Sequence, residues 1–238
     1  MKNPHHEEIL ALIRKRSGTP TQHTFLNSYL GNSHPRYPIN APALRDIAKT
    51  WMRGHKDLTA SEFEDLLTSL IEGESSTEKV IAGIMMDYAT REQLAINPKV
   101  FDRWLGHLEG WAEVDAVCTN KYTVKQLPLD WKKWEPMLTR FSKEQDIHKR
   151  RASLVLLCSP LRKIEDERLV DTALKNVARL KAEKHVLITK AISWVLRSAI
   201  KYHKKSITDF LKKNKETLPP IAVRETMTVL RTGKKTKG

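Results

Sequence analysis

Apolar residues recur along most of the chain at the three- and four-residue spacing of amphipathic helices. One clear case contains Phe63, Leu66 and Leu70 and follows Thr59, a residue type that caps helix N-termini. Helices of this kind are expected around residues 9–13, 25–30, 42–51, 63–71, 77–88, 97–108, 111–124, 131–141, 146–159, 169–180, 185–203 and 207–215, and after Pro220. The chain shows no convincing pair of strands. The pattern therefore predicts an all-α protein.

The spacing of distinctive residues indicates a repeat. Trp111 and Arg151 are 40 residues apart, and Arg151 and Trp194 are 43 apart. Helical hairpins of HEAT and armadillo repeats have periods of roughly 40 to 47 residues. We therefore expect a HEAT-like, armadillo-type superhelical solenoid of stacked helical hairpins over residues 1–232, followed by a basic disordered tail at 233–238. Helices that start near 77, 111, 146 and 185 are expected to line its concave face.

Charge narrows the class of partner. The 238 residues include 42 Lys and Arg against 28 Asp and Glu, a net charge of +14. Such a balance favours a polyanion, with nucleic acid first and an anionic membrane second. It predicts that the concave face is basic.

The two cysteines and the absence of long apolar stretches suit a cytoplasmic protein. Two cysteines make neither a disulfide framework nor a zinc site, as is usual in a reducing compartment. The sequence has no apolar leader and no stretch of membrane-spanning length. We expect a cytoplasmic location and no membrane partner.

Motifs for cofactors and metals are absent. There is no phosphate-binding glycine loop, no dinucleotide turn and no His-Glu-x-x-His. The cluster His5–Glu8 contains metal-ligating residue types, but it lies at a terminus that we expect to fray. We therefore predict no cofactor and no metal site.

Trp111 and Asp115 lie one turn apart on the same face of a predicted helix. Val114, Val117 and Cys118 can serve the core instead. Aspartate is a poor helix former, so its mid-helix position is informative. A salt bridge or a cap is the structural alternative to a chemical role for Asp115.

A second stripe lies on the helix around Trp194. Lys190, Trp194, Arg197 and Lys201 follow one another at positions i, i+4, i+7 and i+11. Cations beside an aromatic ring suit a surface that grips phosphates and offers a π face. Alternatively, Trp194 packs in the core and the cations face solvent. Arg151, just before an apolar stretch, is expected at the boundary of the core.

These segments resemble the AlkD family, HEAT-like DNA glycosylases that remove alkylated purines. Trp111–Asp115 resembles the family motif Trp-x-x-Val-Asp, and Arg150–Ala152 resembles its Arg-Ala. Lys190–Arg197 resembles Lys-Ala-Ile-x-Trp-Val-Leu-Arg, the most specific stretch, and Pro38–Arg45 resembles Gly-Ile-x-x-Pro-x-x-Arg. Tyr29 falls where the family has a tyrosine near the lesion. The resemblance extends from about Tyr29 to Leu230.

The resemblance implies a glycosylase that acts on duplex DNA carrying N3-methyladenine or N7-methylguanine, without base flipping. It assigns Asp115 to stabilising the sugar cation and orienting water, and Trp111 and Trp194 to holding the lesion.

The resemblance and the stripe together assign the DNA contacts. Arg151, Arg45 and Arg197 are expected to hold phosphates, beside Tyr29 and Lys190. A monomer without an obligate protein partner is expected, because a solenoid with a polar outer face needs none.

The sequence departs from the family at Gly110, Ala112 and Ala41, where bulky, acidic and hydroxyl side chains are expected. Two other classes of protein remain compatible with the pattern. One is a HEAT-repeat protein that binds DNA structures or lesions without catalysis. The other is an armadillo-type scaffold that binds acidic peptides.

Overall fold

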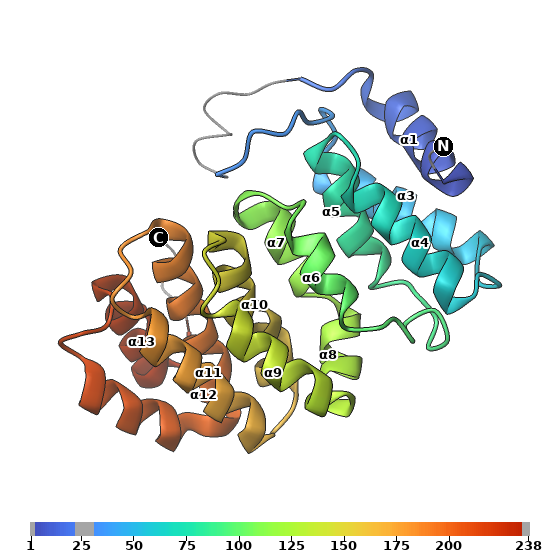
Figure 1. The fold of residues 1–238 in the computed structure, drawn as a ribbon. Coiled ribbons are helices and arrows are strands. Elements are labelled where there is room, and N and C mark those ends of the chain that lie inside the picture. Colours follow the sequence, from blue (N-terminus) through green and yellow to red (C-terminus); the bar gives the residue numbers. More distant parts are fainter. Residues whose placement is uncertain (1–2, 22–30, 235–238) are drawn as a thin grey trace. The chain divides into compact units, whose positions relative to one another are not determined.

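The computed structural model describes residues 3–21 and 31–234 (Figure 1). Within them are twelve helices and no strand, apart from one isolated bridge between Thr21 and Arg36. The all-α prediction is therefore confirmed. The helix expected around residues 25–30 lies outside the described residues.

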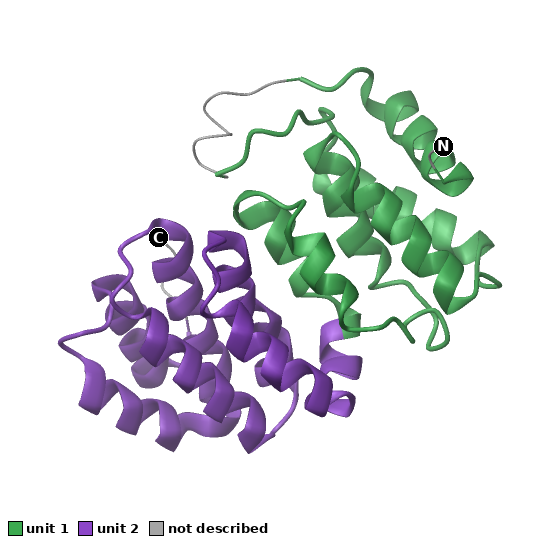
Figure 2. Cartoon of the chain, in the orientation of Figure 1, with its two compact units in different colours: residues 1–122 green, residues 123–238 purple. Residues whose placement is uncertain are grey.

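The chain divides into two compact units, residues 1–122 and 123–238, with the boundary inside helix α8 (Figure 2). The expectation of a single repeat domain over residues 1–232 concerns how the two act together and stays a prediction.

The first unit is built from α1 (Pro4–Ser17), α3 (Ala41–Gly54), α4 (Ala60–Ile71), α5 (Ser76–Met85), α6 (Val100–Leu105), α7 (Gly110–Cys118) and the start of α8 (Lys121–Leu129). Helix α5 packs against α3, α4 and α7. Aromatic side chains that are fully buried fill the core, among them Phe63, Phe101 and Trp104. The predicted Thr59 cap is confirmed, because Thr59 and Glu62 form a reciprocal capping box at the start of α4.

The second unit is built from the rest of α8, α9 (Trp131–Phe141), α10 (Ile147–Lys163), α11 (Glu167–Leu180), α12 (Val186–Asn214) and α13 (Pro220–Thr232). Helix α10 packs along α12, α11 packs against both of them, and α13 packs against α12. Within each unit, the helices expected to line one face are therefore neighbours: α5 beside α7, and α10 beside α12.

Several predicted helix ends were wrong. Helix α10 does not end at Ser159–Pro160 but continues to Lys163, with Pro160 inside it. The helix expected over residues 111–124 is two helices, because α7 ends at Cys118 and Tyr122 lies fully buried on α8. The break between the predicted helices 185–203 and 207–215 is a kink in α12 at His203, whose φ of −123° and ψ of 38° are not helical.

The N-terminal helix also differs from the expectation of a frayed end. Helix α1 begins at Pro4, and the Asn3 side chain accepts a hydrogen bond from the backbone N–H of His5. His6 is fully buried, and its Nε2 lies 2.8 Å from Oε1 of Glu78. The helix is therefore capped and anchored.

Among the described residues, no helix combines the length and the apolar character required to cross a lipid bilayer.

Candidate functional site

Helix α7 presents Trp111 and Asp115 on one face, as their spacing predicts. Both side chains are partly exposed, whereas Val114, Val117 and Cys118 are fully buried. The core stripe of α7 is therefore occupied by other residues, and its indole and carboxylate lie beside it.

The first turn of α7 is held by the contacts of two carboxylates, Glu113 and Glu109. Glu113 is fully buried and accepts hydrogen bonds from the Asn32 side chain at 3.0 Å and from the backbone N–H of Glu109 at 2.8 Å. Nδ1 of His34 lies 3.0 Å from Oε1 of Glu113. Glu109 in turn accepts two hydrogen bonds from Ser33, both at 2.8 Å. These bonds fix the start of the helix that carries Trp111.

Sequence reasoning missed this carboxylate pair. The one sequence feature that could have indicated it is the spacing of Glu109 and Glu113 on either side of Trp111. Their partners come from residues 32–34, about 80 positions earlier, so the sequence did not indicate what they bind.

Arg45 lies on α3 of the same unit with its side chain 55% exposed. Its Nη1 lies 3.7 Å from Oδ2 of Asp87, which makes a loose ion pair. Burial raises the pKa of the Asp87 carboxyl above its ordinary value, although the hydrogen bond from the Lys121 backbone and the charge of Arg45 both lower it. A phosphate could therefore approach the Arg45 guanidinium without breaking a tight pair.

In the second unit, Trp194 is partly exposed on α12, while Ile192, Val195 and Leu196 are buried. Residues other than Trp194 therefore supply the core face of this helix. Arg162 of α10 lies over the Trp194 ring, 6.0 Å from its centroid. This cation was not predicted, because it comes from another helix.

The other members of the α12 stripe differ in their surroundings. Lys190 is exposed. The Arg197 side chain is 16% exposed, and its Nη2 lies 3.2 Å from Oε2 of Glu225 on α13. Ser193 links the two, since its hydroxyl donates to Glu225 at 2.6 Å and lies 3.2 Å from Nε of Arg197.

Arg151 lies deeper than the core boundary at which we expected it. The residue is 4% exposed, and its Nη1 donates to the backbone carbonyl of Leu187 at 2.5 Å. This bond joins α10 to the first turn of α12. The neighbouring Arg150 is also engaged, in an ion pair with Glu183 at 2.8 Å.

The structure thus brings the predicted residues together in two groups, each within one unit. Trp111 and Asp115 share α7, and Lys190, Trp194 and Arg197 follow one another along α12. Tyr29 lies outside the described residues. Whether the two groups face the same ligand stays a prediction.

The net positive charge of the chain comes from its second unit. Residues 123–238 contain 28 of the 42 Lys and Arg and 12 of the 28 Asp and Glu, a net charge of +16. Residues 1–122 carry a net charge of −2. The group that includes Lys190 and Trp194 therefore lies in a strongly basic unit, and Asp115 lies in a slightly acidic one.

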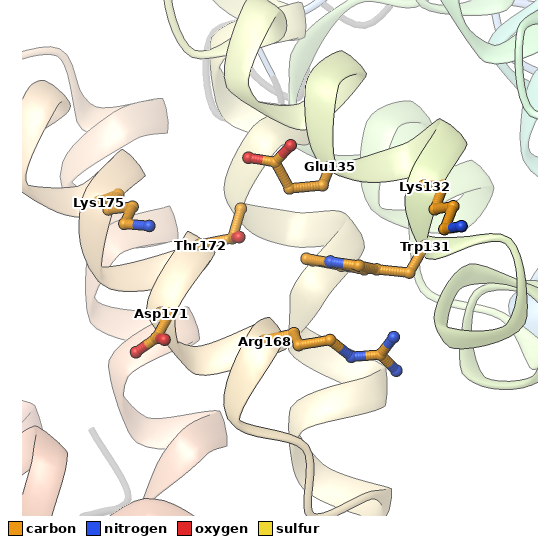
Figure 3. Close-up of a pocket in the computed structure, with 7 residues that line it drawn as sticks. All are labelled: Trp131, Lys132, Glu135, Arg168, Asp171, Thr172 and Lys175. Carbon is orange, nitrogen blue, oxygen red and sulfur yellow. The ribbon is translucent and has the colours of Figure 1, made fainter.

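A pocket of about 480 Å³ lies between α9 and α11 of the second unit and is lined by none of the predicted site residues. Figure 3 shows Trp131 above Arg168, whose guanidinium carbon is 5.7 Å from the centroid of the Trp131 ring. Glu135 and Asp171 face the same space as Lys132 and Lys175, so the lining has mixed charge. Such a lining does not select one kind of ligand.

Fold and sequence together define the class of protein: an all-α chain of packed helical hairpins. A solved structure described as "Predicted DNA alkylation repair enzyme from Enterococcus faecalis" has the same fold, with a TM-score of 0.65 over 98% of this chain and 98% of that chain. The identity is 17%, so this similarity shows the fold alone. No curated protein matches the sequence.

A family model supplies the more specific assignment. The model of the DNA alkylation repair enzyme family matches residues 14–230, and the chain therefore belongs to this family. The resemblance to the AlkD-like proteins is confirmed.

Proposed function

We propose that this protein is a DNA glycosylase of base excision repair, which hydrolyses the N-glycosidic bond of cationic alkylated purines in duplex DNA. N3-methyladenine and N7-methylguanine are the substrates that the family resemblance favours. The observation that carries the proposal is the pairing of Trp111 and Asp115 on the exposed side of α7 in a member of this family. The proposed hydrolysis requires side chains of this chain and a water molecule, and it requires no metal or cofactor.

The charge of the lesion determines which catalytic group is required. A purine alkylated at N3 or N7 is cationic and leaves as a neutral base, so it needs no general acid. The deoxyribose left behind develops oxocarbenium character and attracts a negative group. An aspartate is ionised at neutral pH, so Asp115 can stabilise that cation and orient the attacking water.

The two indoles are proposed to hold the lesion while it remains stacked in the duplex. The face of an indole attracts a cation, and the positively charged nucleotide presents one. Trp111 lies one turn from Asp115, and Trp194 is partly exposed on α12 with Arg162 near its ring. We propose that the duplex is contacted by both groups of residues, without extrusion of the base.

Phosphate contacts are assigned by exposure and charge. Arg45 and Lys190 are exposed cations that can reach a DNA backbone directly. Arg197 shares its charge with Glu225, and a phosphate would compete with that carboxylate. Arg151 is held by the Leu187 carbonyl, so in this proposal it contributes positive potential and positions α12. Tyr29 keeps its predicted place near the lesion.

Release of free base from methylated duplex DNA tests the proposal. Asp115→Asn keeps the shape of the side chain and removes its charge, so we expect most excision of N3-methyladenine and N7-methylguanine to be lost and DNA affinity to be nearly unchanged. Asp65→Asn, at an exposed aspartate on α4 of the same unit, is the matched control and should release base at the wild-type rate. Wild-type release by Asp115→Asn would show that the carboxylate has another role.

The same assay separates the proposal from its main alternative, a HEAT-repeat protein that binds lesions without catalysis. That alternative predicts tight binding of methylated duplex and no base release by the wild-type protein. A cytoplasmic location, a monomeric state and the absence of an obligate protein partner belong to the same proposal.

A further inference from the structure

Two histidines and a glutamate meet where α1 packs against the C-terminal end of α3. Nδ1 of His5 lies 3.4 Å from Oε2 of Glu8, and Nε2 of His55 lies 3.8 Å from the same oxygen. The three ligand atoms all lie within 4.8 Å of one another. His5 and Glu8 are one turn apart on α1, and His55 follows α3, 50 residues further along the chain.

We propose that His5, Glu8 and His55 form a binding site for a divalent transition-metal ion, for which zinc is the closest fit. Zinc binds imidazole nitrogen and carboxylate oxygen at roughly 2.0–2.2 Å. In a tetrahedral site these bond lengths place neighbouring ligand atoms roughly 3.3–3.6 Å apart. The separations of 3.4 and 3.8 Å are close to that range, so small side-chain adjustments would complete the site.

The tautomer of His55 is already suited to this role. Its Nδ1 lies 2.8 Å from the backbone carbonyl of Trp51, which can accept but cannot donate a hydrogen bond. The proton therefore resides on Nδ1 of the neutral ring, and the lone pair of Nε2 points to the side of Glu8. Metal-binding histidines commonly have such a carbonyl partner, which orients the ring and raises its basicity.

Glu8 is also oriented by a hydrogen bond from a residue that is not itself a proposed metal ligand. The indole N–H of Trp51 donates to Oε2 of Glu8 at 3.2 Å. The Trp51 ring also stacks on His55, with centroids 3.7 Å apart and an interplanar angle of 8°. One buried tryptophan thus orients two of the three proposed ligands.

Exposure leaves room for a fourth ligand. The side chains of His5 and His55 are each 30% exposed, and that of Glu8 is 52% exposed. Two histidines, one carboxylate and a water molecule make up a coordination set that zinc adopts where one position stays open. The ion would link α1 to α3, and we expect it to stabilise the first unit. This inference is independent of the proposed glycosylase activity.

Titration of the full chain with zinc, followed by calorimetry at neutral pH, tests the site. We expect one equivalent to bind, and the melting temperature to rise with zinc concentration. His55→Ala and Glu8→Gln should each weaken binding by about tenfold or more, since each removes a ligand. His107→Ala is the matched control, because His107 is an exposed histidine beside a carboxylate, Glu72 at 3.6 Å, in the same unit.

Two further measurements keep the inference testable if a ligand variant is poorly folded. Trp51→Phe retains an aromatic ring but removes the N–H that orients Glu8, and it should weaken zinc binding by about tenfold. Co²⁺ in place of zinc should give the visible absorption of a tetrahedral ion in the wild type and not in His55→Ala. Absence of saturable binding to the wild type, or equal affinity in His55→Ala, Glu8→Gln and the control, would overturn the proposal.

Discussion

Gly83 of α5 lies directly against the backbone of Ala116 of α7. A Cβ atom at Gly83 would come within 2.3 Å of the Ala116 carbonyl oxygen and 2.8 Å of the Val117 nitrogen. Real Cβ atoms do not approach backbone so closely, so only glycine permits this contact between the helices. Ala116 is the neighbour of Asp115, and the packing of α5 therefore sets the position of the proposed catalytic carboxylate.

Gly83→Ala should consequently impair both stability and activity. The new methyl group has to displace backbone rather than a flexible side chain, and we expect a loss of about 1–3 kcal/mol in the free energy of unfolding. Urea denaturation measures this loss, and base release measured under native conditions should fall with it. Gly54→Ala is the control, because a Cβ there meets nothing within 4 Å, and that variant should be at least as stable as the wild type.

Neutralising Glu225 should strengthen DNA binding. Glu225 is the ion-pair partner of Arg197, so Glu225→Gln leaves more of the guanidinium charge for a phosphate. We expect higher affinity for duplex DNA and a log–log salt dependence that is steeper by up to about 0.9. Glu216→Gln removes the same charge at an exposed position after α12 and should change the slope less. Equal effects of the two variants would show that Arg197 has no contact of its own.

Removing a cation from the α12 stripe should have the opposite effect on the slope. If Lys190 holds one phosphate, Lys190→Gln should reduce the slope of log affinity against log salt by about 0.9. Lys205→Gln is a suitable control, since Lys205 lies beyond the kink at His203 and is paired with Asp209 at 3.1 Å. An unchanged slope in Lys190→Gln would remove Lys190 from the proposed DNA contacts.

Ser75 and Glu78 form a buried capping box at the start of α5, and it predicts how stability depends on pH. Burial tends to raise the pKa of Glu78, but hydrogen bonds with His6 and Ser75 outweigh burial and hold that pKa below its ordinary value of 4.5. A lowered folded-state pKa stabilises the protein above the pKa of the unfolded chain, and this contribution is lost as pH falls through the folded value. Stability should therefore decline below about pH 4.5 in the wild type.

Glu78→Gln should be less stable at neutral pH and should lose part of that acid dependence. Urea denaturation at pH 7 and at acid pH measures both effects. Glu62→Gln changes the equivalent residue in the capping box of α4, which is exposed, and should have a smaller effect. If the two variants showed the same pH dependence, burial of the His6–Glu78 pair would not be its source.

Local pattern predicted most of the helices because each one buries a stripe of its own sequence. The Thr59 capping box is read from neighbouring residues, and the pairing of Trp111 with Asp115 follows from helical geometry alone. The end of α10 could not be predicted in this way. Pro160 lies inside the helix because packing on α11 and α12 outweighs the loss of its N–H.

Contacts between residues that are far apart in the sequence could not be predicted either, because packing between helices determines them. Lys79 is almost fully buried and donates to the carbonyls of Ile71 and Gly73 at the end of α4, so its charge is not part of the surface. The His5–Glu8 cluster was not predicted to bind a metal because its terminus was expected to fray, and the sequence did not show that His55, which follows α3, lies beside it. The spacing of residues along one helix predicts which side chains share a face, but only the fold shows which helix faces pack against each other.

The unequal division of charge has a consequence for how the protein would search a genome. The net charge is +16 on residues 123–238 and −2 on residues 1–122. Undamaged duplex DNA should therefore attract the second unit strongly and the first unit hardly at all. If the proposed function is correct, the protein should travel along DNA held mainly by its second unit, with Asp115 disengaged. A positively charged nucleotide supplies the local attraction that undamaged DNA lacks, and we expect the dwell time at a lesion to depend on it.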